Sequence, residues 1–73
     1  MQLSDKDTTW IDASLVALIR PYAIKTDGMQ PGTVVFLPAA KIWLECYDQP
    51  IICVWDDQPK REEDLTILRH KSH

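Results

Sequence analysis

The sequence predicts an α+β fold in which one N-terminal amphipathic helix packs on a small antiparallel sheet of three or four strands. Three observations lead to this prediction: an apolar stripe with helical spacing near the N-terminus, a central run of β-branched residues, and a two-part apolar segment after it. A small all-β barrel is the alternative. With 73 residues, the chain is expected to form one small domain that spans residues 1–73.

The predicted helix covers about residues 5–20. Ser4 followed by Asp5 is typical of a helix start, because the hydroxyl accepts a free backbone N–H and the acid favours the positive end of the helix dipole. The apolar positions that share one face at helical spacing are Ile11, Leu15, Leu18 and Ile19. Pro21 is expected to end the helix at the residue before it. A strand over residues 16–24 is the competing interpretation.

Turn signals divide the next part of the chain. Residues 26–32 contain Asp-Gly and Pro-Gly pairs and are predicted to form a loop, which leads to a strand over residues 33–37. Pro38-Ala39-Ala40 is expected to break that strand. After a polar connection, residues 65–69 alternate and favour a last strand, with a short helix that begins near Pro59 as the alternative.

Residues 41–47 and 51–55 predict a β-hairpin that is apolar on both faces. A turn at residues 47–50 places Cys46 opposite Ile51 and Leu44 opposite Cys53. A register two residues away places Cys46 opposite Cys53 and leaves the same residues on each face. The face predicted to form the core carries Ile42, Leu44, Cys46, Cys53 and Trp55.

The second face of this hairpin is the candidate binding site, because it combines apolar residues with a charged rim as protein interfaces do. The predicted partner-binding residues are Lys41, Trp43, Glu45, Tyr47, Ile52, Val54 and Asp56. The alternative is that the segment from Leu65 onward, or a second copy of the protein, covers this face. The best functional signal in the sequence would then be part of the core.

Charge and hydropathy narrow the class of partner. The 11 acidic and 8 basic residues give a net charge of −3 without a basic stripe, so nucleic acid is not expected as the primary partner. Glu45 between Trp43 and Tyr47 also opposes phosphate, although single-stranded nucleic-acid binding stays as an alternative. The N-terminus lacks the basic start and apolar core of a secretory signal, and no run is long enough to span a membrane. We therefore expect a cytoplasmic protein.

The sequence predicts neither an enzyme nor a cofactor or metal site. The two histidines, His70 and His73, lie at the end of the chain, and the two glycines do not form a phosphate-binding loop. Six residues separate Cys46 from Cys53, which is wider than the usual spacing of structural zinc ligands. We expect both thiols to be free and buried, with a disulfide compatible only with the second hairpin register.

A compact chain from Met1 to His73, with mild acidity, surface aromatic candidates and no catalytic set, resembles the small accessory proteins of bacteriophages. Those proteins bind host machinery, RNA polymerase among them. The resemblance implies a non-enzymatic protein-interaction module that regulates transcription by occupying a host or cognate protein, as a monomer or weak homodimer. A self-associating structural protein is a further alternative.

Overall fold

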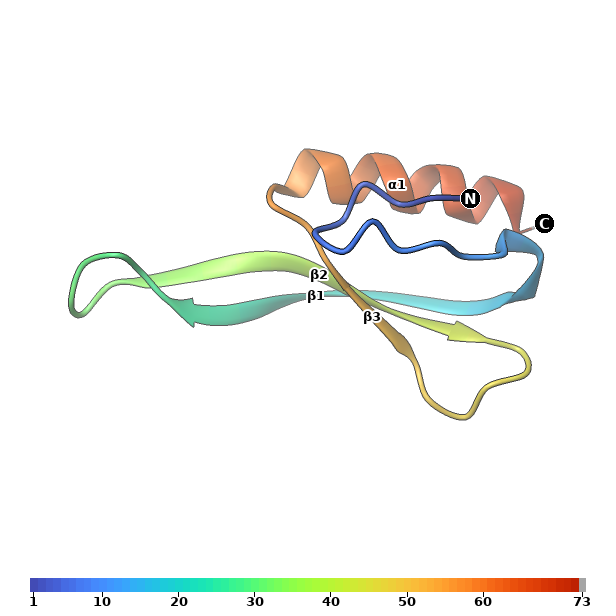
Figure 1. Cartoon of the computed structure of the whole chain (residues 1–73), viewed down its shortest axis with the longest axis horizontal. Coiled ribbons are helices and arrows are strands. Elements are labelled where there is room, and N and C mark those ends of the chain that lie inside the picture. The colour runs from blue at the N-terminus through green and yellow to red at the C-terminus, as the bar shows by residue number, and fades with distance from the viewer. Residues whose placement is uncertain (73) are drawn as a thin grey trace.

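The computed structural model describes residues 1–72 and contains a three-stranded antiparallel sheet followed by a C-terminal α-helix (Figure 1). The strand order is β1-β2-β3, so β2 is the central strand. The elements are the 3-10 turn η1 (Ala13–Leu15), β1 (Val16–Asp27), β2 (Val34–Leu44), β3 (Ile51–Val54) and α1 (Gln58–Lys71). The predicted N-terminal helix packed on the sheet is therefore wrong, and the chain is not an all-β barrel either.

The first twelve residues form an irregular segment that closes on itself instead of a helix. Leu3 N donates to Thr9 O at 2.8 Å, and Ile11 N donates to Met1 O at 2.8 Å. The carboxylate of Asp5 accepts from both the backbone N and the hydroxyl of Thr9 at 2.7 Å, so it stabilises this loop rather than a helix start. The competing strand interpretation of the following residues is correct, since β1 begins at Val16.

Two prolines lie inside strands without breaking them. Trp55 N donates to Pro38 O at 2.8 Å, so the main chain of Pro38 faces β3, at the point where β3 ends. Ala23 pairs with Pro38, and by alternation Pro21 also turns its main chain away from β2 toward the outer edge of β1. Neither proline removes a hydrogen bond between β1 and β2. The predicted break at Pro38 is therefore wrong.

The C-terminal segment is a helix, as the alternative interpretation had it, and not a strand over residues 65–69. The Asp57 side chain accepts from Lys60 N at 2.9 Å and caps the first turn, which also contains Pro59. Leu65 and Leu68 are fully buried at helical spacing. The basic residues of the last turn, Arg69, His70 and Lys71, complement the helix dipole.

The β2–β3 hairpin has a longer connection than predicted, residues 45–50, and a different register. Ala40 pairs with Cys53 and Ile42 with Ile51, whereas the prediction placed Leu44 opposite Cys53. The predicted register is wrong by an even number of residues. Each residue of the two strands therefore stays on the face to which it was assigned. The predicted core residues Ile42, Leu44, Cys53 and Trp55 are confirmed as buried. Cys46 is exposed in the connection, so its predicted place in the core is wrong.

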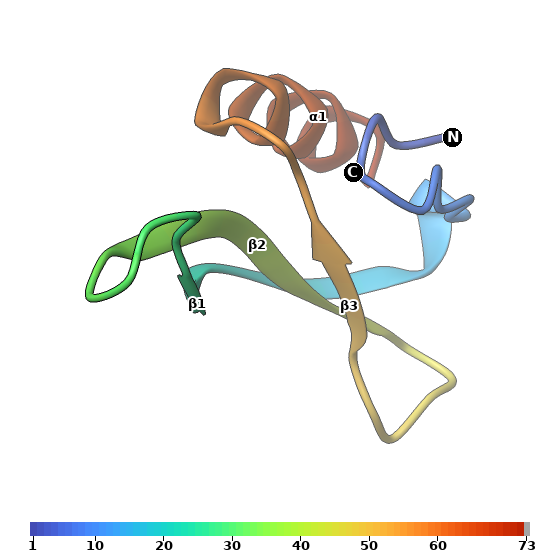
Figure 2. The same ribbon diagram turned by 60° about the vertical axis from the view of Figure 1, so that its left-hand side comes forward.

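The core lies on one side of the sheet only. Both α1 and the N-terminal segment lie on that side in two views (Figures 1 and 2). The buried apolar residues that pack together there are Leu3, Ile11, Ala13, Val16, Ala40, Ile42, Leu44, Cys53, Trp55, Leu65 and Leu68. The C-terminal segment therefore does not cover the second face of the hairpin, which answers the question that the sequence left open.

Two polar side chains of α1 fix it over the sheet. The buried carboxylate of Asp64 accepts from Trp55 Nε1 at 2.8 Å and from Ser4 N at 2.6 Å. Near the start of the helix, Arg61 donates through Nη1 to Tyr22 O at 3.1 Å and to Ala39 O at 3.4 Å. The helix is thus anchored to the N-terminal segment, to the end of β3, and to the β1–β2 pair.

Replacement of Asp64 tests the first of these anchors. Asp64→Ala leaves the Trp55 indole N–H and the Ser4 amide without their acceptor, so the free energy of unfolding should fall by about 2–3 kcal/mol. Urea denaturation measures the change. The matched control is Glu63→Ala, because Glu63 is an exposed neighbour on the same helix and should change stability by less than about 0.5 kcal/mol. Equal effects of the two substitutions would contradict the anchoring role.

Candidate functional site

The side of the sheet that faces away from α1 is the candidate site, and we call it the open sheet face. It is formed by alternate residues of the three strands, which share one side because side chains alternate along a strand. Its central residues are Leu18, Arg20, Tyr22, Lys41, Trp43, Ile52 and Val54. The apolar surface continues along the β1–β2 hairpin through Ile24, Val35 and Leu37.

The open sheet face is largely apolar and uncovered. Leu18 is 45% exposed and Ile52 is 52% exposed, while Trp43 and Val54 are half-buried among their neighbours. Ala39 is fully buried yet lies outside the core cluster, because Tyr22 and Val54 flank it on this face. Within residues 1–72, α1 and the N-terminal segment both lie on the other side of the sheet, so neither covers this face (Figures 1 and 2).

Two cations lie in the middle of this face. Arg20 and Lys41 stand directly opposite each other across β1 and β2, an arrangement that costs energy because like charges repel. The Lys41 ammonium lies 5.3 Å from the ring centroid of Tyr22, where the electrons of the ring attract it. None of the strand residues on this face is acidic. An anionic group from a partner would relieve the repulsion.

The structure divides the predicted binding residues into two groups. Lys41, Trp43, Ile52 and Val54 lie together on the open sheet face. Glu45, Tyr47 and Asp56 do not belong to the strands: the first two lie in the connection after β2, and Asp56 follows β3 and pairs with Lys6 at 3.1 Å. Glu45 therefore lies beyond the strand that carries Trp43, and the charged residues within the strands of this face are Arg20 and Lys41.

Sequence reasoning missed the contribution of β1 to this face. Leu18 and Arg20 fell within the predicted helix and Tyr22 lay beyond its end, although the competing strand over residues 16–24 contains all three. Hydropathy does not alternate along this stretch, so no period of two marked these residues as one face of a strand. Outside the face, the sequence also gave no reason to expect the exposed aromatic residues Trp10, which is 72% exposed, and Phe36, which is 63% exposed.

The two cysteines differ in their exposure to solvent. Cys46 is exposed and Cys53 is buried, and both are free thiols. Burial, together with the nearby negative charge of Asp5, raises the pKa of the Cys53 thiol to about 11. Among residues 1–72, no group of three His, Cys, Asp or Glu side chains is placed to hold a metal ion. His73, one member of the predicted histidine pair, lies outside the described residues.

Comparison with known proteins adds no relative. No protein-family model, curated protein or solved structure matches the chain. In the described part of the chain, no helix has the length and apolar character needed to cross a membrane.

The two thiols should differ in reactivity. At pH 8 an alkylating reagent should modify Cys46 in the folded protein and reach Cys53 only after unfolding, because the raised pKa keeps the buried thiol protonated. Mass spectrometry of proteolytic peptides distinguishes the two sites. Rapid modification of Cys53 without denaturant would contradict the burial of this thiol.

The same pKa predicts how stability depends on pH. Because the folded pKa of Cys53 lies above the ordinary value of 9.0, its contribution is fully present below about pH 9 and is lost as the pH rises to about 11. The free energy of unfolding of the wild type should fall over this range more steeply than that of Cys53→Ala. Cys46→Ala is the control and should retain the wild-type slope.

Proposed function

We propose that this protein is a non-enzymatic interaction module that binds a partner protein on the open sheet face. The observation that supports this proposal is the uncovered apolar surface around Trp43, Leu18 and Ile52 in a chain whose only α-helix, among residues 1–72, packs on the other side. Half-buried aromatic side chains surrounded by apolar neighbours are the usual anchors of protein interfaces. Trp43 is the expected anchor here.

The charges on the face favour an acidic partner over a second copy of the same chain. Two copies placed face to face would bring the Arg20 and Lys41 pairs together, and no strand residue of the face supplies a compensating carboxylate. A partner surface with an apolar centre and acidic groups opposite these two cations would complement it. The like charges of Arg20 and Lys41 therefore disfavour self-association through this face, which was the structural-protein alternative from the sequence.

The role of such a module would be regulation by occupation of a partner surface. The resemblance to bacteriophage accessory proteins that bind host machinery such as RNA polymerase stays a prediction, because the fold and the comparisons bear on neither the source nor the partner. Regulation of transcription stays a prediction for the same reason.

Single-stranded nucleic acid is the second candidate partner, and one observation favours it. Arg20 and Lys41 lie on the same face as the aromatic rings of Tyr22 and Trp43, which is the combination that single-strand binders use to hold phosphate and stack bases. The cations are only two, however, and the chain has a net charge of −3. A protein partner is therefore the function that we propose.

Three tryptophan substitutions test the protein-binding proposal. In a pull-down from the source organism, Trp43→Ala should lose a partner that the wild type and Trp10→Ala both retain, because Trp10 is exposed but belongs to the N-terminal segment. The partner is then identified by mass spectrometry and its affinity measured with purified protein.

Trp43→Ala should keep the wild-type circular dichroism spectrum, whereas Trp55→Ala should lose about 3–5 kcal/mol of stability. Unfolding of Trp43→Ala, or a wild-type dimer that this substitution dissociates, would contradict the proposal.

Titration with oligothymidine tests the second candidate. The protein-binding proposal predicts no binding to a labelled oligothymidine at low salt, measured by fluorescence anisotropy. If binding occurs, falls steeply with added salt and is weakened by Lys41→Gln, nucleic acid replaces protein as the partner. Lys71→Gln is the control, because Lys71 is a cation of α1 that lies outside the open sheet face.

A further inference from the structure

The outer edge of β1 carries free main-chain groups near its start. The main chain of Pro38 faces β3, so its partner Ala23 faces the outer edge of β1, and alternation gives Ile19 the same direction. The N–H and C=O of Ile19 therefore point away from β2. Two residues later, Pro21 has no N–H to donate. Pro21 thus interrupts the free edge and leaves a short stretch before it that can pair with another chain.

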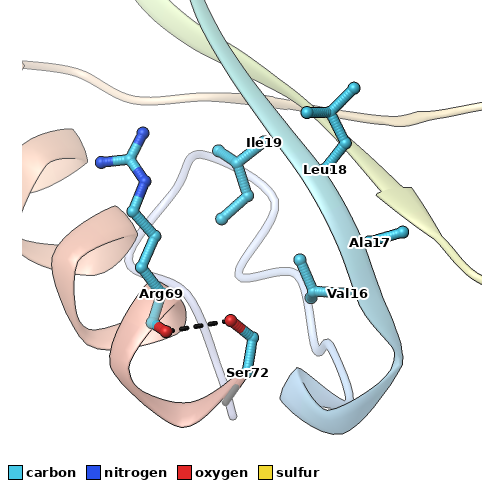
Figure 3. Close-up of a pocket in the computed structure, with 6 residues that line it drawn as sticks. All are labelled: Val16, Ala17, Leu18, Ile19, Arg69 and Ser72. Carbon is cyan, nitrogen blue, oxygen red and sulfur yellow. Dashed lines mark hydrogen bonds between the residues drawn. The ribbon is translucent and has the colours of Figure 1, made fainter.

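A groove runs beside this stretch. The helix α1 packs on β2 and η1. The start of β1 lies beside the last turn of α1. The groove has a volume of about 280 Å³, and its walls are Val16–Ile19 of β1 and Arg69 and Ser72 of the last helical turn and its cap (Figure 3). In this view Ile19 points toward the helix side and Leu18 points the other way. An added strand would thus have side chains in the groove and beside the open sheet face.

One cation, Arg69, lines the groove. Arg69 also lines a neighbouring hollow of about 400 Å³ with Thr66 and His70, and among residues 1–72 no Asp or Glu side chain lines either space. The ion pairs recorded among residues 1–72, Lys6 with Asp56 and Arg61 with Glu62, do not involve Arg69. Its backbone carbonyl accepts the Ser72 hydroxyl at 2.9 Å, which holds the end of the helix while the guanidinium extends beside the groove.

We propose that this groove binds an extended acidic peptide segment of a partner protein by β-strand addition to the edge of β1 at Ile19. Backbone hydrogen bonds to Ile19 would supply affinity, and alternate side chains would supply selectivity. Carboxylates on one side of the added strand would pair with Arg69, and apolar side chains on the other would extend the surface beside Leu18. A second copy of β1 fits less well, because Arg20 and Arg69 of two copies would approach each other without a carboxylate.

This inference depends on the edge of β1 and on Arg69, whereas the proposed function depends on Trp43, so different substitutions test the two proposals. The probe is a fluorescein-labelled peptide of three Val-Glu repeats, titrated into the full-length protein and followed by anisotropy. A peptide of three Val-Lys repeats is the matched control. The acidic peptide should bind and the basic one should not, and Arg69→Gln should weaken binding about tenfold. Lys71→Gln should leave the affinity within about twofold of the wild type, because Lys71 does not line the groove.

A second pair of measurements separates strand addition from attraction of charge alone. Binding should slow hydrogen exchange of the Ile19 amide, measured by NMR, and methylation of alternate backbone nitrogens of the peptide should abolish binding. The proposal is overturned if the methylated peptide binds equally well or if Ile19 exchange does not change. It is also overturned if an oligothymidine of the same net charge binds as tightly as the peptide, because the groove would then be a general anion surface.

Discussion

The buried carboxylate of Asp64 is the constraint on which the rest of this structure depends. It accepts hydrogen bonds from the indole of Trp55 and from the backbone of Ser4, and so it joins the helix, the end of β3 and the N-terminal segment at one point. All three elements meet on the same side of the sheet. Within residues 1–72, this junction gathers the helix and the N-terminal segment on one side of the sheet and leaves the open sheet face uncovered.

The helix is held at a second point by Arg61, whose guanidinium bonds to carbonyls of β1 and β2. Together the two contacts set the position of α1 across the sheet. The helix covers β2 and η1 but leaves the start of β1 beside Arg69 as an exposed step. The same arrangement thus produces two different surfaces: a flat apolar face with two cations, and a short groove with one cation, Arg69, along a strand edge.

Local patterns predicted some features of this fold, and contacts distant in sequence determined the others. The two faces of the β2–β3 hairpin could be assigned because the alternation of side chains survives an even register error. The N-terminal helix was wrong because Ser4 and Asp5 resemble a cap, whereas Ser4 N bonds to Asp64, sixty residues away. The last segment was uncertain because Leu65 fits both a strand and a helix. Only its packing with Leu68 and the cap at Asp57 decide for the helix. The part of the open sheet face on β2 and β3 was predicted from the hairpin. The part on β1 was not predicted, because residues 16–20 were assigned to a helix.

Pro21 has a consequence for how this protein behaves at high concentration. A strand of twelve residues at the edge of a sheet is long enough to act as a template for further chains, and uninterrupted edges of this kind seed fibrils. The proline removes one outward N–H from the row, so β1 cannot pair with an added strand continuously along its whole length. The edge is left as two shorter pieces, one before Pro21 and one after it, and an added chain pairs with one or the other.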